Sequence, residues 1–390
     1  MKIAIIGSGN AGTWTALHYA YYTRYDKNIE VELIHDPEID SQPVGQAFFP
    51  WQSELLYYAC DIDWYHNEIR ATPKLGILYE NWSKKNPNLF HEFPFNVVAM
   101  QADPKYLQRY ILNSGLFTVK ERNVTDLDTV DADVIFDCRG YTKKDNIEYE
   151  PLYCPVNSVL LVVGSSPTSP QLWSRHVATK DGWTFVIPNT TNTTSYGYLY
   201  NKDITSLETA KTNFNELFPQ AFEHTQKVVN LPFESYLAKE PLRIDSNGRK
   251  IILNGNRLTF LEPMEATSIT LYNFVASSTF NWVINGDDRI KAYLHLPEVT
   301  SKIKIMIHEI STFILWHYTK GSVYDTPFWK AAQAETTTIF EQPNEHFQNI
   351  VNLTKSIDYI DLKVERFMKE ASYGVWPPYS IKRWYDGYIQ

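Results

Sequence analysis

The chain has 390 residues and a formal net charge of −9, and 44% of its residues are hydrophobic, 15% aromatic and 21% charged. This length suffices for two or three packed units, and the acidic balance argues against a nucleic-acid partner. Three cysteines without metal-ligand spacing, no cleavable signal and no long apolar stretch predict a cytoplasmic protein with no metal site and no membrane span.

The first predicted unit is a strand, a glycine-rich turn, a helix and a second strand. The apolar run 2–6 is followed by the turn 7–12 (GSGNAG), a helix over 13–22 and a strand over 29–34. Glycines in such a turn let the backbone approach a pyrophosphate, and the helix N-terminus stabilises its charge. The unit therefore predicts dinucleotide binding. The expected contacts are Gly7, Gly9, Asn10, Ala11 and Gly12 at the phosphates, and His35 or Asp36 at the ribose.

Two later strands, at 134–136 and 250–253, are predicted to end at the same cofactor edge. β-forming residues between them predict a separate, mostly antiparallel sheet over the cofactor, with strands at 95–100, 158–163, 183–187 and 195–200. The nucleotide-binding module would then be discontinuous over 1–290, with the sheet inserted at roughly 80–100 and 155–240.

The pattern becomes helical after residue 263. Apolar residues recur at helical spacing over 267–284 and 302–317, and more weakly over 364–372. We expect 291–390 to form a helical region that contributes to a substrate pocket. The aromatic segments 376–379 and 384–385 are predicted to pack the tail down, with closure over a pocket as the alternative.

Seven short patterns occur in order and together resemble flavin-dependent halogenases of the tryptophan-halogenase type. They are the opening glycine turn, 44–50 (VGQAFFP), 71–77 (ATPKLGI) followed by Trp82, 182–188 (GWTFVIP), 195–200 (SYGYLY), 260–268 (FLEPMEATS), and the pair 317–318 (HY) and 325–329 (DTPFW). The resemblance implies an α/β fold. It would comprise a Rossmann-like FAD domain of the glutathione-reductase or flavin-monooxygenase type, an antiparallel sheet over the cofactor and a C-terminal helical region.

The chain departs from the family pattern at five positions and is shorter after residue 330. The substitutions are Gln46 for Glu, Phe185 for Trp, Asn256 for Asp, Ala266 for Ser and Ser268 for Gly. These changes concern the substrate more than the reaction type. The short C-terminal part predicts a more open pocket and looser substrate choice.

The resemblance also implies the chemistry and the site residues. FADH2, O2 and a halide ion (chloride, bromide or iodide) would yield hypohalous acid, which Lys74 holds beside an electron-rich aromatic substrate. Glu265 would polarise that acid or accept the proton lost by the arene, and Thr267 and Ser268 would bind the halide. A separate NAD(P)H-dependent flavin reductase would supply FADH2. The remaining cofactor contacts would be Gly45, Gln46, Ala47, Asp137, Trp183, Gly255 and Asn256, with Trp183 shielding the flavin from the substrate.

Several alternatives stay open at the level of sequence. Glu265 and Thr267 would, on a structural interpretation, merely cap the helix that follows them. Asp137 would only pack a strand end, and His317 is given no catalytic role. The chain as a whole could instead be a single-component flavin monooxygenase that oxidises NADPH, or a flavin-binding protein without catalysis. A homo-oligomer is compatible with the sequence.

Overall fold

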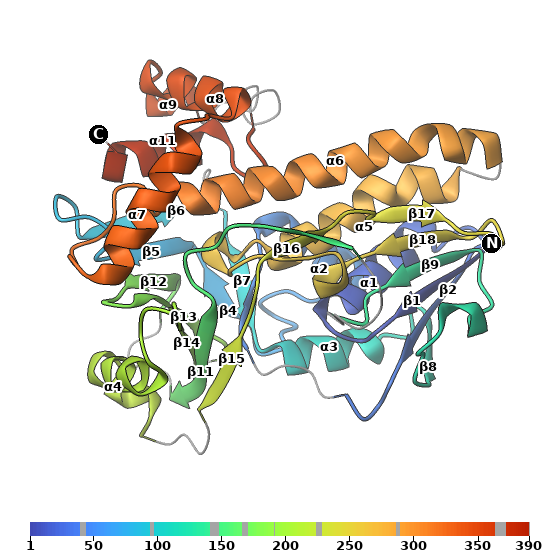
Figure 1. The fold of residues 1–390 in the computed structure, drawn as a ribbon. Coiled ribbons are helices and arrows are strands. Elements are labelled where there is room, and N and C mark those ends of the chain that lie inside the picture. Colours follow the sequence, from blue (N-terminus) through green and yellow to red (C-terminus); the bar gives the residue numbers. More distant parts are fainter. Residues whose placement is uncertain are drawn as a thin grey trace.

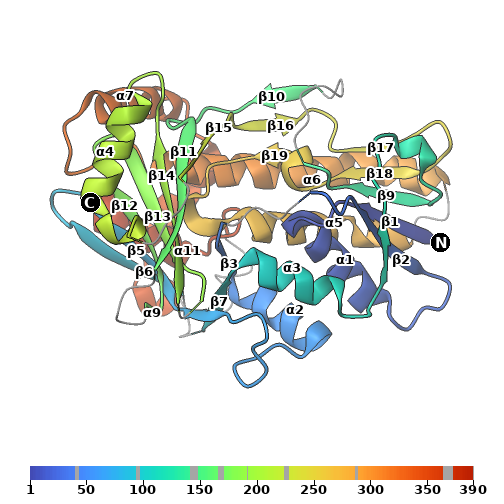
Figure 2. The ribbon, with the colours of Figure 1, turned by 90° about the horizontal axis from the view of Figure 1, so that it is seen from below.

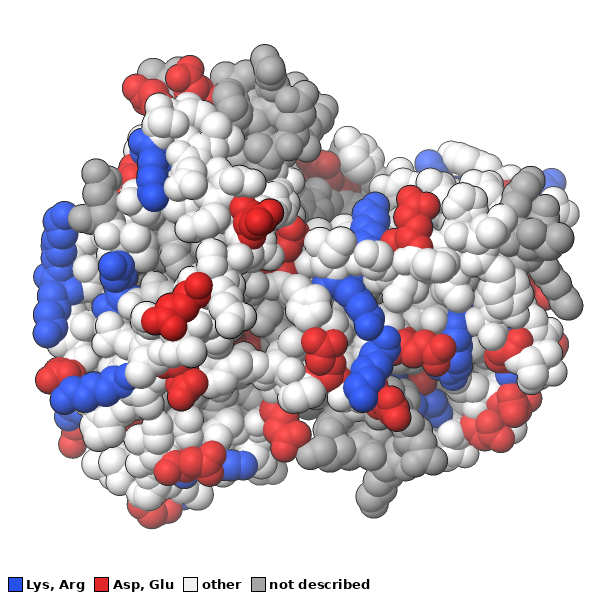
Figure 3. Space-filling view, turned by 45° about the horizontal axis from the view of Figure 1, so that its top comes forward, with Lys and Arg blue, Asp and Glu red and all other residues white. Residues whose placement is uncertain are grey.

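The computed structural model describes residues 1–39, 44–93, 97–140, 148–165, 171–190, 192–223, 228–285, 289–362 and 372–389. Two sheets lie at opposite ends of the molecule, and the long helix α6 (Arg289–Trp316) runs between them (Figure 1). In these ranges, no helix combines the length and the apolar character needed to cross a membrane. Acidic and basic side chains are interspersed on the face shown in Figure 3.

A six-stranded sheet forms one end of the fold and contains the predicted dinucleotide-binding strands. Its order is β17-β18-β9-β1-β2-β8, and all neighbouring pairs are parallel except β17 with β18. The central strand β1 is almost entirely buried, because α1 (Asn10–Thr23) covers one face of the sheet and the segment 124–132 packs on the other. The strands predicted at 2–6, 29–34, 134–136 and 250–253 are confirmed. The strands are β1 (Lys2–Ile6), β2 (Glu30–His35), β8 (Thr118–Glu121), β9 (Val134–Asp137), β17 (Leu242–Ile244) and β18 (Lys250–Leu253).

Helices α1 (Asn10–Thr23), α5 (Ser268–Ile284) and α6 pack in succession beside this sheet (Figure 2). The first predicted helix is confirmed, but it begins at Asn10, inside the glycine turn, because Gly9 is its N-cap residue. The predicted helices at 267–284 and 302–317 are confirmed as α5 and α6. The helix predicted at 364–372 falls almost entirely outside the described residues.

A seven-stranded sheet forms the other end, in the order β15-β11-β14-β13-β12-β5-β6. Its pairs are antiparallel except β12 with β5, so the prediction of a mostly antiparallel sheet is confirmed. The strands are β5 (Gly76–Glu80), β6 (Asn88–Glu92), β11 (Ser158–Ser165), β12 (Ser174–Ala178), β13 (Gly182–Pro188), β14 (Thr193–Tyr200) and β15 (Val229–Pro232).

The strand predicted at 95–100 does not belong to that sheet. Residues 94–96 lie outside the described ranges, and β7 (Ala99–Ala102) pairs instead with β3 (Gln46–Ala47) and β4 (Thr72–Lys74). Apolar alternation predicts a strand but not its partners, which are set by contacts distant in sequence. A further small sheet joins β10 (Tyr149–Pro151), β16 (Tyr236–Ala238) and β19 (Thr259–Phe260).

The C-terminal segment returns to the seven-stranded sheet, where α11 (Pro378–Trp384) packs against α8 (Glu345–Lys355) and β6. This places the end of the chain beside the strands that follow Lys74. The remaining helices are α2 (Pro50–Cys60), α3 (Pro104–Leu112), α4 (Leu207–Leu217), α7 (Pro327–Phe340), α8 (Glu345–Lys355), α9 (Tyr359–Leu362) and α11 (Pro378–Trp384). The short turns of helix are 127–129, 219–221, 255–257, 264–266 and 385–389.

Candidate active site

Lys74 ends strand β4 and is completely buried, with 0% of its surface exposed. Its Nζ has no hydrogen-bond partner among the described residues. The centres of the Phe93 and Phe49 rings lie 5.4 Å and 5.9 Å from this nitrogen. Burial lowers the pKa of Lys74 to about 8, although the charge of Glu265 acts in the opposite direction. Near neutral pH this ammonium is therefore poised to lose its proton.

Glu265 lies on a tight turn before α5. Its φ is 63°, and that of Ala266 is 55°, so two consecutive non-glycine residues adopt the left-handed conformation. Such residues typically cost about 1–3 kcal/mol each and persist where the surrounding structure holds them. This turn directs the carboxylate away from the helix and into a cluster of aromatic and histidine side chains.

Four side chains surround the carboxylate of Glu265. Its Oε1 accepts hydrogen bonds from the Tyr79 hydroxyl and from His317 Nε2 at 3.0 Å, and His91 Nδ1 lies 3.3 Å from the same oxygen. Its Oε2 accepts a bond from Trp376 Nε1 at 3.1 Å. Strands β5 and β6, the end of α6 and the tail each supply one of these groups.

The charge of Glu265 is stabilised by its neighbours. Burial alone would raise the pKa of this carboxyl, but His91 and His317 outweigh burial and hold the pKa well below its usual range. His317 Nδ1 lies 2.7 Å from the Phe313 carbonyl, which can only accept, so Nδ1 donates there. Nε2 is the nitrogen that faces Glu265. Glu265 is best described as an ionised acceptor held by these neighbours.

The capping alternative for Glu265 and Thr267 is wrong. Thr267 is the N-cap residue of α5 but makes no capping bond through its side chain, and Glu265 is engaged by the cluster described above. No acidic side chain occupies the first turn of α5. Thr267 and Ser268 thus stand directly after Glu265 at an uncapped helix N-terminus, which is a favourable place for an anion.

The glycine turn forms a backbone cradle at the end of β1. A Cβ on Gly12 would lie 1.8 Å from the Gly7 carbonyl oxygen, whereas a Cβ on Gly9 would meet nothing within 4 Å. Gly9 is the N-cap residue of α1, so no side chain caps the first N–H groups of the helix. The turn is tightly packed on its inner side and open at Gly9, a shape that fits the pyrophosphate of a dinucleotide.

Some of the other predicted cofactor residues lie at this cradle, and the rest lie in the region around it. At the cradle, a Cβ on Gly255 would lie 2.5 Å from that of Ala11, so the turn 255–257 packs on the glycine motif. Asn10 accepts a bond from Gln108 at 2.8 Å, and the Asn256 carbonyl accepts one from the Tyr236 hydroxyl at 2.7 Å.

His35 and Asp36 are half-buried at the end of β2, next to Gly7, whose N–H donates to the Ile34 carbonyl at 2.8 Å. The segment around Gly45 is tied to β14, because the Gly45 N–H donates to Ser195 Oγ at 2.9 Å. Ala47, on β3, is buried. The Gln46 amide donates locally to the Val44 carbonyl at 3.0 Å.

The structure favours the packing interpretation of Asp137. Its carboxylate accepts bonds from Arg139 at 2.9 Å and from Arg257 at 3.0 Å. Burial opposes the charge, but these guanidinium groups lower the pKa of Asp137. Both carboxylate oxygens are engaged, and through Arg257 Asp137 holds the turn 255–257, which contains Asn256.

Trp183 is buried on β13, and its indole N–H donates to Glu262 Oε2 at 2.8 Å. Tyr318 donates to the same oxygen at 2.6 Å. Burial raises the pKa of Glu262 to about 7, although these two bonds partly oppose the rise. The sequence assigned no role to Glu262, Tyr79 or His91, and it did not predict the contacts that Trp376 and His317 make with Glu265. His317 and Glu262 lay within recognised motifs, but Tyr79 and His91 carried no sequence signal.

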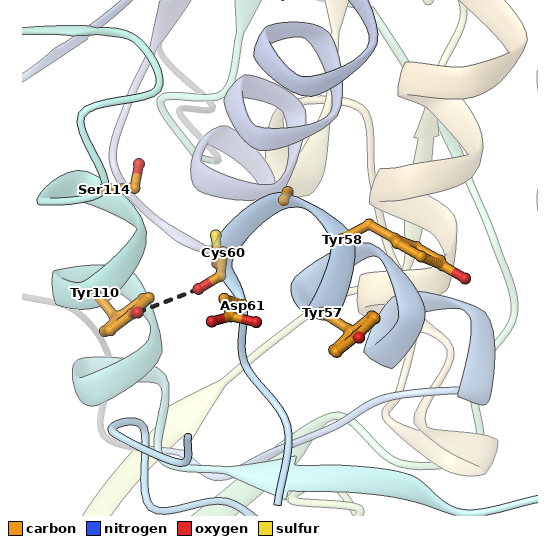
Figure 4. Close-up of a pocket in the computed structure, with 7 residues that line it drawn as sticks. Tyr57, Tyr58, Cys60, Asp61, Tyr110 and Ser114 are labelled. Carbon is orange, nitrogen blue, oxygen red and sulfur yellow. Dashed lines mark hydrogen bonds between the residues drawn. The ribbon is translucent and has the colours of Figure 1, made fainter. Parts of the chain in front are cut away.

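Neither Lys74 nor Glu265 lines the two surface cavities beside α2. A cavity of about 430 Å³ opens between the end of α2 and α3 and is lined by Tyr57, Tyr58, Asp61 and Tyr110 (Figure 4). A second one, of about 290 Å³, shares the two adjacent tyrosines of α2. Glu265 itself is enclosed by packed side chains rather than facing either cavity.

Comparisons with known proteins agree with this architecture. The family model described as tryptophan halogenase matches residues 2–115 and 117–375. A tryptophan 6-halogenase from Streptomyces toxytricini is 17% identical, covers 99% of this chain and 90% of its own, and superimposes with a TM-score of 0.79. The flavin-dependent halogenase BrvH from Brevundimonas sp. BAL3 is 17% identical, covers 99% of this chain and 89% of its own, and has a TM-score of 0.78. A flavin-dependent halogenase from Xanthomonas campestris is 16% identical, covers 99% of this chain and 88% of its own, and has a TM-score of 0.79. A search of curated protein sequences finds no match.

Proposed function

Because the chain belongs to the tryptophan halogenase family, we propose that it halogenates an electron-rich aromatic substrate by means of hypohalous acid held at Lys74. One observation carries the proposal: an ammonium group that is fully buried, lacks a hydrogen-bond partner in the described structure, and lies within the field of a buried carboxylate. An unpaired buried cation is costly to a fold, so its presence favours a functional role.

The cradle at Gly7, Gly9 and Gly12 supports FAD as the cofactor, with the N-terminus of α1 facing the pyrophosphate. When bound, reduced FAD would supply, together with O2, the oxidising equivalents that convert a halide ion to hypohalous acid. We propose Thr267 and Ser268 as the halide contacts, since an uncapped helix N-terminus attracts anions. Trp183, fixed by Glu262, would separate the flavin from the substrate.

Lys74 would act by donating a hydrogen bond to the hypohalous acid or, as the neutral amine, by forming a haloamine. A pKa of about 8 makes both forms accessible near neutral pH. Glu265 would stabilise the cation that forms when the arene is attacked. A carboxylate whose pKa is held this low is a weak base, so its main contribution is electrostatic stabilisation of the cation. The arene proton is removed after that cation has formed.

The assay combines the purified protein with FAD, O2, bromide or chloride, a separate NAD(P)H-dependent flavin reductase, and a panel of indoles and phenols. The tryptophan halogenases among the similar structures make indoles the first choice. Halogenated product detected by mass spectrometry supports the proposal. Lys74→Ala should abolish it, whereas Lys211→Ala, which alters a partly exposed lysine on α4, should not.

The same assay separates the two rival functions. NADPH oxidation without the reductase, with hydroxylated product and no need for halide, would identify a single-component monooxygenase. Failure to bind FAD, or FAD binding without any oxygen-dependent turnover, would identify a non-catalytic protein. Full activity in Lys74→Ala would contradict the assigned role of the lysine.

A further inference from the structure

The two oxygens of Glu265 have different surroundings. Oε1 is approached by Tyr79, His91 and His317, whereas Trp376 is the one donor to Oε2 within the described part of the chain. Trp376 is 2% exposed, and its ring lies 4.3 Å from that of Phe313. Oε2 is therefore the oxygen of Glu265 with the fewest donors among the residues described, and the indole N–H of Trp376 already occupies it.

The four neighbours of Glu265 also differ in how firmly the fold holds them. Tyr79 and His91 lie on adjacent strands of the seven-stranded sheet, and His317 directly follows the long helix α6. Trp376 lies on a short connection, held by one isolated bridge to Tyr373 and followed by α11. Because packed side chains enclose Glu265, an arene reaches it only if one neighbour moves, and Trp376 has the least backbone support.

We propose that Trp376 holds the place of the substrate at Glu265, and that an arene displaces it when the arene carries its own N–H or O–H donor. If an arene without a donor displaced Trp376, Oε2 of Glu265 would be buried without a hydrogen bond. The free-energy cost of such an unpaired oxygen exceeds the net gain from a typical hydrogen bond. Sites that bind a polar substrate group reject analogues that lack it for this reason. The inference rests on the proposed function, since it assumes that the substrate reacts beside Glu265. It makes Trp376 a competitor that weakens the binding of every arene, while Oε2 of Glu265 selects indoles and phenols because it requires a donor.

The test measures binding rather than turnover. Dissociation constants for indole, 1-methylindole, phenol and anisole are determined by calorimetry on the protein without reduced flavin. The unmodified protein should prefer indole over 1-methylindole, and phenol over anisole, by roughly tenfold or more. Trp376→Phe keeps an aromatic ring but removes the competing donor. All four ligands should therefore bind it roughly tenfold more tightly, and the two preferences should stay unchanged.

Trp384→Phe is the matched control. Trp384 belongs to the same aromatic cluster, with its ring 3.9 Å from that of His317, but its indole nitrogen has no partner in the described structure. Removing that N–H breaks no hydrogen bond, so the four dissociation constants should stay within about twofold of the unmodified protein. A gain in affinity in both variants would show loosened packing and overturn the role of Trp376.

A second readout uses the unmodified chain and does not depend on the folding of a variant. Backbone hydrogen exchange across 372–389 should speed up when indole is added, because binding releases the tail. Unchanged affinities in Trp376→Phe, equal affinity for indole and 1-methylindole, or slower exchange in the tail would each overturn the inference. If binding follows the expectation but the complete assay yields no halogenated product, the proposed function fails and the role of Trp376 stands.

Discussion

Replacing Lys74 with Met should stabilise the fold while abolishing the proposed activity. The substitution keeps an unbranched side chain, one atom shorter than lysine, and removes a charge that has no hydrogen-bond partner in the described structure. The fall in the lysine pKa from 10.5 to about 8 corresponds to about 3 kcal/mol, since each unit is worth 1.36 kcal/mol. We therefore expect Lys74→Met to raise the free energy of unfolding at pH 7 by about 3 kcal/mol.

The sign of the pH dependence follows from proton binding. Below pH 8 the lysine is protonated in both the folded and the unfolded chain, so the folded state carries the full penalty. Between pH 8 and 10.5 only the unfolded chain keeps the proton, and the stability of the unmodified protein rises with pH. The advantage of Lys74→Met should thus be largest below pH 8 and disappear near pH 10.5. Other titrating groups cancel when the two proteins are compared.

The assay is urea unfolding of the cofactor-free proteins at pH values from 7 to 10, followed by tryptophan fluorescence. Lys250→Met is the matched control, because that buried ammonium donates to the Trp282 and Val283 carbonyls at 2.9 Å and 3.1 Å. Removing it should lower the free energy of unfolding by about 1–3 kcal/mol. The reasoning is refuted if Lys74→Met is less stable than the unmodified protein at pH 7, or if the difference does not change with pH. Stability gained with loss of turnover would be a trade-off between stability and function.

Four further substitutions test the glycine cradle and the two buried carboxylates, Asp137 and Glu265. Gly12→Ala should destabilise the fold, because its Cβ would meet the Gly7 carbonyl. Gly9→Ala should unfold like the unmodified protein but bind FAD more weakly. Equal effects of the two substitutions in unfolding experiments and in FAD titrations would contradict this contrast. Asp137→Asn should lower the free energy of unfolding in urea by about 3–5 kcal/mol by leaving two guanidinium groups unbalanced, and a loss below about 1 kcal/mol would show that the ion pairs matter little. Glu265→Gln should lower kcat by about a hundredfold with little change in KM. Because the pKa of Glu265 is low, protonation of this carboxyl should cause no fall in the activity of the unmodified enzyme above pH 5. A fall in activity above pH 5 that is absent from Glu265→Gln would refute the low pKa.

The nucleotide-binding unit was predictable because its signals are local. Strand, glycine turn, helix and second strand follow one another within 36 residues, and the structure confirms each of them. The partners of the strand predicted at 95–100 were not predictable, because pairing depends on β3 and β4, which lie elsewhere in the sequence.

The candidate site was predictable only in part. The ordered motifs pointed to Lys74 and Glu265, which the fold brings into one buried region where their charges interact. The surroundings of Glu265 come from β5, β6, the end of α6 and the tail, so no local pattern could assemble them. The C-terminal aromatics were expected to pack or to cover a pocket. Trp376 confirms the packing interpretation, since it is buried and donates to the carboxylate.

The length of helix α6 sets the position of His317 relative to the six-stranded sheet. The helix begins beside the six-stranded sheet, spans 28 residues and so extends about 42 Å, ending one residue before His317. Inserting one residue in this helix would turn His317 by about 100° relative to the start, away from Glu265. Length changes in this protein should therefore be confined to loops, because the registry of α6 fixes the imidazole that keeps Glu265 charged.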